Sequence, residues 1–145
     1  MNLVTRHHPK LTLEGARAVL RAAQRRAEEI QVPMDIAIMD EGGHLLVFER
    51  MDGAKPSSIS IAMIKAQSAA LRRAATGPAM DVDNNVNLPL ALGIAIANPS
   101  QQTPIRGGVP LVVDGQVVGA IGVSAGKEEQ DLDVARAGAA ALEKA

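Results

Sequence analysis

The segment from Val109 to Val123 constrains the fold of this chain more than any other. It consists of two apolar runs, Val109–Val113 and Val117–Val123, separated by a short polar connection that contains Asp114-Gly115. An Asp-Gly pair readily supplies the positive φ angles of a tight two-residue β-turn. The segment therefore predicts an antiparallel hairpin.

The apolar spacing changes directly after this hairpin. Leu132, Ala135, Ala139 and Leu142 recur at the spacing of one helical face, and acidic residues precede them. A helix is therefore expected after the second strand of the hairpin. Before the hairpin we expect a helix capped by Thr12 and running to about Ile30, strands at 36–39 and 44–50, and a helix from Ser57 or Ser58 to about Thr76.

The region between the second helix and the hairpin is ambiguous. Residues 81–87 are rich in Asp and Asn and predict a loop. Leu88–Ala97 is apolar almost throughout, so its pattern fits a short helix or a strand equally well. The remaining order of helices and strands predicts an antiparallel sheet with helices packed on it.

The composition predicts one small-residue core. A chain of 145 residues fits a single domain, assigned to residues 11–145, and residues 1–10 are expected to form a flexible tail. Hydrophobic residues make up 47% of the chain, yet Phe48 is its only aromatic residue. Small aliphatic side chains bury little area each, so we expect a homo-oligomer to supplement the core.

Charge and composition also exclude several classes of partner. The net charge of −1 and the near absence of aromatic residues argue against nucleic-acid binding. No apolar run is long enough to span a bilayer, and the N-terminal segment MNLVTRHHPK has no hydrophobic signal core. Cysteine is absent, which excludes disulfides and thiolate chemistry. A cytoplasmic protein without membrane contact is expected.

Three longer motifs carry a resemblance to a known family. They are GGVPLVVDGQVVGAIGVSAG followed by EEQD and VARAG, PMDIAIMDEGGHLLVFERMDGA at 33–54, and SSISIAMIKAQSAA at 57–70. Together they resemble the GlcG/HbpS family, described as haem-binding or haem-degrading, whose domain also forms the C-terminal part of PduO-type proteins. Ser68 stands where the family commonly has threonine, and residues 77–103 match no pattern of the family that we can state.

The resemblance implies a fold and a ligand. The fold is a profilin-like α/β/α sandwich, an α+β arrangement in which helices flank a five-stranded antiparallel sheet. The ligand is haem or a related tetrapyrrole, and the assembly is a closed homo-oligomer.

The helix that begins near Ser58 carries the first candidate site. Ser58, Lys65, Ser68 and Arg72 are spaced so that they share one helical stripe. Two cations and two hydroxyls on one face suit a carboxylate, and a partly buried lysine with a lowered pKa could serve as a base. The simpler alternative is a solvent-facing stripe with no function.

The segment Arg106-Gly107-Gly108 is the second candidate site. Two glycines let a backbone approach a ligand, and free N–H groups beside a guanidinium suit an anion. The alternative is a loop that needs unusual backbone angles. We predict that Lys65 and Arg106 face one cavity and hold the carboxylate of a small anionic ligand.

Carboxylates and histidines provide weaker candidates. Glu128 and Asp131 are spaced to bind a metal cation jointly, although acidic residues in a first helical turn are also explained by the helix dipole. His44 follows a Gly-Gly turn, and His7 and His8 lie in the tail. Each is a candidate haem ligand because cysteine and tyrosine are missing, but exposed histidines are the simpler interpretation.

Three functions remain open from the sequence. The first is binding of a carboxylate-bearing ligand such as haem. The second is a cofactor-free isomerase or lyase acting on a small organic acid, with Lys65 or His44 as acid or base and Arg106 holding an anionic group. The third is a purely structural accessory subunit.

Overall fold

Four strands form one antiparallel sheet in the order β2-β1-β4-β3. The computed structural model describes residues 1–143. The strands are β1 Asp35–Asp40, β2 Leu45–Arg50, β3 Gly108–Val113 and β4 Gln116–Ser124. The helices are α1 Leu13–Glu29, α2 Ile59–Arg72, α3 Leu88–Ala97 and α4 Glu128–Ala139, with short 3-10 turns at Pro56–Ser58 and Ala140–Leu142.

The predicted hairpin is confirmed. Strands β3 and β4 pair from Gly108–Gly122 to Val113–Gln116, and Asp114 and Gly115 both adopt positive φ angles of 50° and 75°. Positive φ at both central residues is the geometry of the turn whose twist matches that of paired strands. The first strand, β1, lies in the centre of the sheet and pairs with β2 on one side and β4 on the other.

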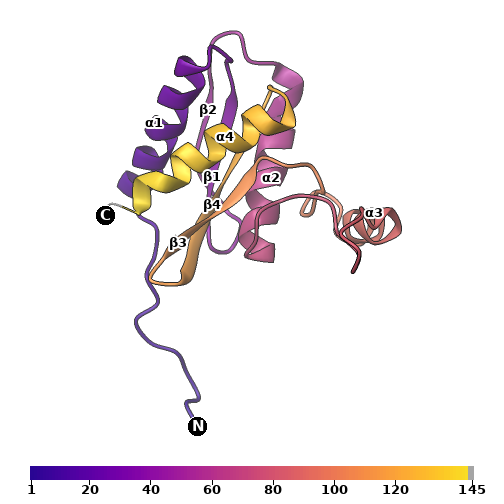
Figure 1. The fold of residues 1–145 in the computed structure, drawn as a ribbon. Helices are drawn as coiled ribbons and strands as arrows, with labels where there is room; N and C mark the ends of the chain where they lie inside the picture. The colour runs from indigo at the N-terminus through magenta and orange to yellow at the C-terminus, as the bar shows by residue number, and fades with distance from the viewer. Residues whose placement is uncertain (144–145) are drawn as a thin grey trace.

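Helices cover both faces of the sheet (Figure 1). Alternate residues of β1 point to opposite faces: Ile36 and Ile38 join the core beneath α1 and α4, whereas Ala37 and Met39 pack against α2. Helix α1 begins where predicted, since the Thr12 hydroxyl accepts a hydrogen bond from the Gly15 N–H at 3.0 Å. The predicted α/β/α sandwich is therefore present.

Small residues allow α2 to approach the sheet closely. A side-chain carbon at Gly122 would overlap the carbonyl of Ala62, and one at Gly108 would overlap the carbonyl of Lys65. Buried alanines of α2, among them Ala62, Ala66 and Ala69, complete this contact. The close approach explains how a chain with one aromatic residue still builds a closed interior.

The expectation of a fifth strand is wrong, because the sheet has four strands over residues 1–143. The apolar segment that fitted either a helix or a strand forms α3. Asn87 caps it by accepting a hydrogen bond from the Leu90 N–H at 3.1 Å, and Pro89 lies in the first turn, where a helix tolerates proline. The preceding loop contributes only an isolated bridge between Met80 and Val86.

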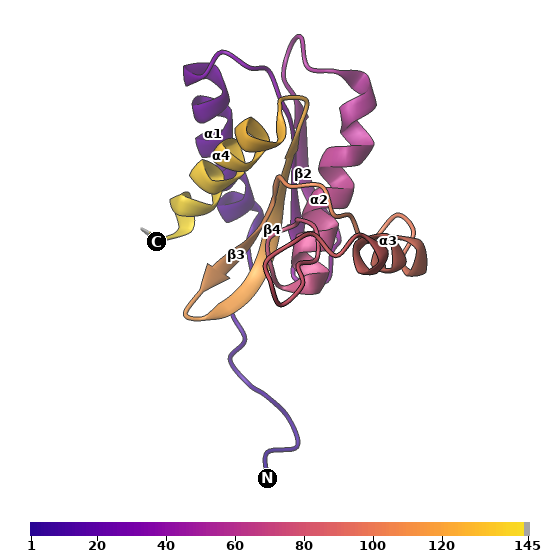
Figure 2. The same ribbon diagram turned by 45° about the vertical axis from the view of Figure 1, so that its right-hand side comes forward.

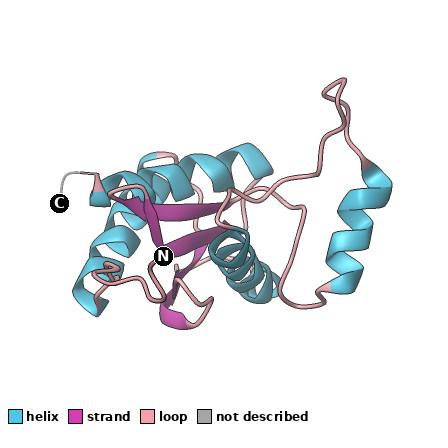
Figure 3. Cartoon of the chain, turned by 90° about the horizontal axis from the view of Figure 1, so that it is seen from below, coloured by secondary structure: helices cyan, strands magenta, loops and turns pink. Residues whose placement is uncertain are grey.

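Helix α3 and the N-terminal segment both extend from the body of the molecule. Figures 2 and 3 show α3 on the α2 side of the sheet, joined to the rest by long loops. Residues 1–8 are exposed and contain no helix or strand. Within residues 1–143, no helix has the length and apolar character needed to cross a membrane.

Candidate functional site

An open apolar pocket lies between α2 and the turn that joins β1 to β2. Its volume is about 620 Å³. One face of α2 supplies most of the wall, the end of β1 and the start of β2 supply the rest, and Ser100 reaches it from the loop after α3. The lining residues are Met39, Gly43, His44, Leu45, Ser60, Ile61, Met63, Ile64, Gln67 and Ser100.

His44 stands at this pocket beside a carboxylate that shapes the turn. Asp40 Oδ1 accepts hydrogen bonds from the backbone N–H groups of Gly42 and His44, both at 2.9 Å. The same oxygen lies 3.4 Å from His44 Nδ1. A histidine whose Nδ1 faces a carboxylate presents Nε2 as its free ligand atom.

The charge of Asp40 is stabilised by the same contacts. Burial acts to raise the pKa of this carboxyl, but the N–H groups of His44 and Gly42 and the His44 ring together outweigh burial. The pKa of Asp40 therefore lies below its ordinary value, and the group is ionised at neutral pH. The side chain of His44 is 82% exposed, so its ring is accessible to a ligand.

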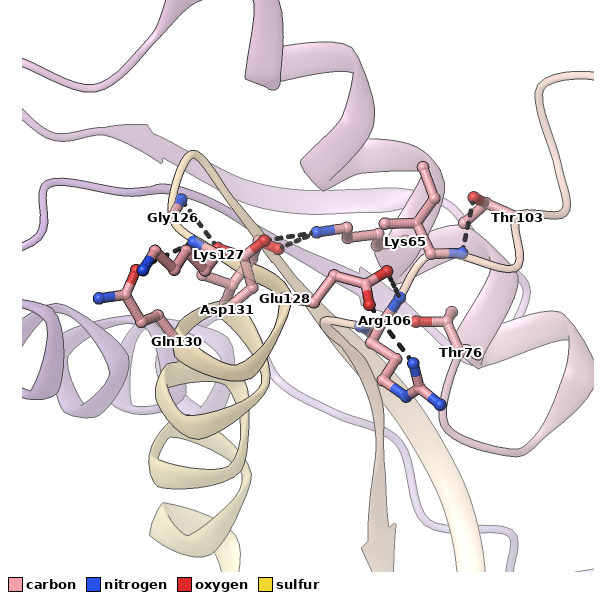
Figure 4. Close-up of polar contacts among 12 residues, drawn as sticks. Lys65, Thr76, Thr103, Arg106, Gly126, Lys127, Glu128, Gln130 and Asp131 are labelled. Atoms are coloured by element: carbon pink, nitrogen blue, oxygen red, sulfur yellow. Dashed lines mark hydrogen bonds and ion pairs between the residues drawn. The ribbon is translucent and has the colours of Figure 1, made fainter. Parts of the chain in front are cut away.

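Lys65 lies in a different place, a buried polar junction at the end of β4 (Figure 4). Its side chain is 1% exposed, and its ammonium donates hydrogen bonds to the Val123 carbonyl and to Asp131 Oδ2, both at 2.8 Å. Asp131 Oδ1 accepts a further hydrogen bond from the Gly126 N–H at 2.9 Å. Burial raises the pKa of Asp131, against the opposing effect of Lys65. The pair joins α2 to α4.

The two glycines after Arg106 are explained by this junction. Gly107 has a φ of 122°, and a side-chain carbon there would lie 2.7 Å from the Val123 carbonyl and 2.9 Å from Lys65 Nζ. Gly108 donates its N–H to the Thr76 hydroxyl at 2.9 Å. Close packing and an unusual backbone angle therefore account for both residues without a ligand.

Arg106 is paired with Glu128 on the surface beside the junction. Its Nη1 lies 3.3 Å from Glu128 Oε2, and both side chains are about half exposed (Figure 4). Neither Lys65 nor Arg106 lines the apolar pocket. Each of the two predicted cations already faces a carboxylate of this chain, so a ligand carboxylate would have to compete with Asp131 or Glu128.

The interpretation of the α2 stripe as solvent-facing is wrong. Ser58, Lys65 and Ser68 are all buried, and only Arg72 at the end of the helix is partly exposed. The Ser68 hydroxyl accepts from the Thr103 N–H at 3.2 Å and donates to Gln102 Oε1 at 3.4 Å. It therefore anchors the loop that leads from α3 to β3.

The two carboxylates that were predicted to bind a metal ion are each paired with a cationic side chain of this chain. Glu128 pairs with Arg106, and Asp131 pairs with Lys65. Over residues 1–143, no three or more His, Asp or Glu side chains gather into a group suited to a metal ion. Joint cation binding by Glu128 and Asp131 remains a prediction that requires both to leave these partners.

Sequence reasoning missed two acidic residues. Asp40, described above, was overlooked because its role depends on the turn that folds back on it. Asp35 is fully buried at the start of β1, and neither of its carboxylate oxygens has a hydrogen-bond partner. Burial raises the pKa of Asp35, and Arg50 opposes this rise. The alternation with Ala37 and Met39 was the signal that places Asp35 on the α2 face.

Comparison with known proteins identifies the family. A model described as haem-degrading protein HbpS-like matches residues 11–140. The chain belongs to the HbpS-like family. The resemblance drawn from the three sequence motifs is thereby confirmed. Protein GlcG of Escherichia coli (strain K12) is 40% identical over 114 residues, which span 79% of this chain and 81% of GlcG.

Solved structures of HbpS-like relatives share the fold. Klebsiella pneumoniae protein ORFY has a TM-score of 0.83 and 28% identity, and the match covers 99% of both chains. The structure of a PduOC–haem complex has a TM-score of 0.80 and 32% identity, covering 92% of this chain and 95% of that one.

Proposed function

We propose that this HbpS-like chain binds haem or a related tetrapyrrole in the apolar pocket beside His44. The observation that carries the proposal is the juxtaposition of an open, mostly apolar wall with an accessible histidine oriented by Asp40. Such a combination suits a flat apolar macrocycle whose iron takes an imidazole ligand. The description of the family and the haem-bound PduOC relative support it.

The residues of the pocket fit the group. Leu45, Ile61 and Ile64 supply apolar contact, and His44 is the one histidine of the chain among the lining residues. Met39 and Met63 also line the pocket and carry thioether sulfurs, which are a known second type of iron ligand. When bound, haem would supply redox-active iron, while the protein would orient it and exclude water from one face.

The propionate groups of a bound haem would not meet the cations that the sequence analysis predicted to hold the carboxylate of a ligand. Among residues 1–143, no lysine or arginine lines the pocket, whose polar members besides His44 are Ser60, Gln67 and Ser100. We infer that propionates would reach solvent through the open side and that binding would depend on apolar contact and ligation. A carboxylate clamp by Lys65, Ser68, Arg72, Arg106, Gly107 and Gly108 is the competing proposal.

A haemin titration tests the proposal. We expect a Soret shift that saturates at one haemin per chain, and a changed spectrum with at least tenfold weaker binding in His44→Ala, because one ligand bond is lost. His8→Ala in the exposed tail is the matched control and should behave as the wild type. Uptake that never saturates, or His44→Ala binding unchanged in spectrum and affinity, would refute the site.

The same geometry favours a second candidate, a cofactor-free enzyme acting on a small organic acid. A histidine oriented by a carboxylate is the arrangement of a general base. Lys65 suits this role less well, because its ammonium is buried and paired. Turnover of an organic acid without haemin, lost in His44→Ala and retained in His8→Ala, would support the enzyme.

A further inference from the structure

Three exposed arginines follow one another along α1. Arg17, Arg21 and Arg25 recur every four residues, and all three are exposed. Four residues of an α-helix rise about 6 Å, so the three side chains extend along about 12 Å of one side of the helix. Among residues 1–143, none of the three takes part in an ion pair or a side-chain hydrogen bond. We call these residues the α1 arginine stripe.

The neighbouring Arg26 differs from the stripe, because this chain provides its partners. Its guanidinium lies 2.9 Å from Asp133 of α4 and 2.9 Å from Glu29. Glu28 follows the stripe by one turn, but it accepts a hydrogen bond from Gln24 at 3.0 Å. Like charges four residues apart on a helix destabilise it. The stripe therefore weakens its own helix, and an anionic partner from outside the chain would offset that repulsion.

An acidic pocket adjoins the C-terminal end of the stripe. Its volume is about 390 Å³, and it lies between the end of α1 and the end of β2. Three carboxylates and one guanidinium line it, so its net charge is opposite to that of the stripe. The lining residues are Gln24, Glu28, Glu49, Arg50, Met51 and Asp52. The surface of α1 therefore changes from positive to negative along the direction of the helix.

This charge pattern fits an acidic helix that carries a basic residue beyond its carboxylates. Guanidinium groups bind carboxylates through two parallel hydrogen bonds, and carboxylates four residues apart on a partner helix repeat at the same spacing of about 6 Å. A basic side chain further along that helix would meet the acidic pocket. A polynucleotide fits less well, because its phosphates would continue into the acidic pocket. Phe48, the only aromatic residue of the chain, packs on the α2 side and offers no stacking surface here.

We propose that the α1 arginine stripe and the adjoining acidic pocket dock an acidic helical segment of a partner protein. Figure 1 shows α1 beside α4, on the face of the sheet opposite α2. The surface is thus separate from the pocket beside His44, and the inference is independent of haem binding. A second copy of this chain does not supply the partner helix, because three carboxylates of α4 pair with cations of their own chain.

Fluorescence anisotropy with a synthetic peptide tests the surface. The probe is a labelled helical peptide with glutamates at three positions four residues apart and a lysine one turn beyond them. We expect saturable binding that weakens with salt, and a loss of about tenfold or more in Arg21→Glu. Arg73→Glu is the control, because Arg73 is exposed at the end of α2 and its replacement changes the net charge equally. No saturable binding by the wild type, equal losses in both variants, or tighter binding of oligo-dT than of the peptide would overturn the proposal.

A charge-swapped peptide and a thermal melt separate docking from a structural role. Arg21→Glu should bind a peptide with lysine at the middle acidic position about tenfold better than the original peptide, because the contact is restored with reversed charges. Its thermal midpoint should equal or exceed that of the wild type, since a carboxylate at this position faces Arg17 and Arg25 one turn away on either side. A lower midpoint would show that the stripe stabilises the fold and would overturn the proposal, as would a charge-swapped peptide that binds no better than the original.

Discussion

The buried junction around Lys65 and the open pocket around His44 both contact α2, but their charged groups differ in burial and in pairing. At the buried junction, Lys65 and Asp131 form a hydrogen-bonded ion pair that joins α2 to α4, and both side chains are almost completely buried. At the open pocket, Asp40 and His44 are paired loosely, and the ring stays accessible. The comparison teaches that a lysine in a family motif can be a buried structural residue, whereas a histidine in a turn can remain accessible to solvent.

The largest expected effect is on stability at the buried junction. Lys65→Met leaves Asp131 buried without its cation, and breaking such a pair costs about 3–5 kcal/mol. Urea unfolding should show this loss. The double variant Lys65→Met with Asp131→Leu should recover most of it, because no uncompensated charge remains. A single variant as stable as the wild type would remove the structural role of the pair.

The next effect concerns the open pocket. Asp40→Asn retains an oxygen that can accept the Gly42 and His44 N–H groups, but it removes the charge beside the ring. Loss of such an orienting carboxylate typically weakens metal binding 10–100-fold. We expect haemin affinity to fall about tenfold with little change in stability. Glu41→Gln, one residue along the turn, is the control and should bind haemin normally.

A smaller effect is expected from Asp35, which belongs to neither region. Burial raises the pKa of Asp35 in the folded state above its value in the unfolded chain. The contribution of this group to the free energy of unfolding is therefore complete at pH values below the unfolded-state pKa. It is lost as the pH rises through the folded-state pKa, because the buried carboxyl then becomes charged. Asp35→Asn removes the buried charge, so it should raise the free energy of unfolding at pH 7 by about 1 kcal/mol. It should also flatten the fall in stability above pH 4, measured by urea unfolding at several pH values. An identical pH profile in both proteins would contradict this account.

The smallest effect is expected at the exposed Arg106–Glu128 pair. Both side chains are about half exposed, and exposed ion pairs contribute roughly 0–1 kcal/mol. Arg106→Met should therefore change the free energy of unfolding by less than about 0.5 kcal/mol. A loss similar to that of Lys65→Met would show that the pair belongs to the junction after all.

Local signals predicted the fold well. The Asp114-Gly115 turn, the Thr12 cap and the periodicity of the helices each depend on neighbours in sequence, and the structure confirms them. The fifth strand was wrong because it came from the family resemblance, whereas residues 77–103 fold around the Asn87 cap and Pro89. A uniformly apolar segment has no periodicity that separates a helix from a strand.

The candidate site was harder to predict, because it depends on contacts between distant segments. Helical spacing placed Lys65 and Ser68 correctly on one stripe, but spacing alone does not say whether that stripe faces water or the sheet. The partner of Lys65 is 66 residues away in α4. His44 was recognised as a candidate, yet its pocket forms only when α2 packs beside the turn.

Parallel haemin titrations of His44→Ala and Arg106→Met test the central claim most directly. The claim is that haem binds at the open pocket beside His44, and that the charged residues at and beside the Lys65–Asp131 junction are structural and do not bind the ligand. We predict that Arg106→Met gives the wild-type Soret spectrum and affinity, and that His44→Ala loses both. Normal binding by His44→Ala together with weakened binding by Arg106→Met would contradict the account and move the site to the predicted carboxylate clamp.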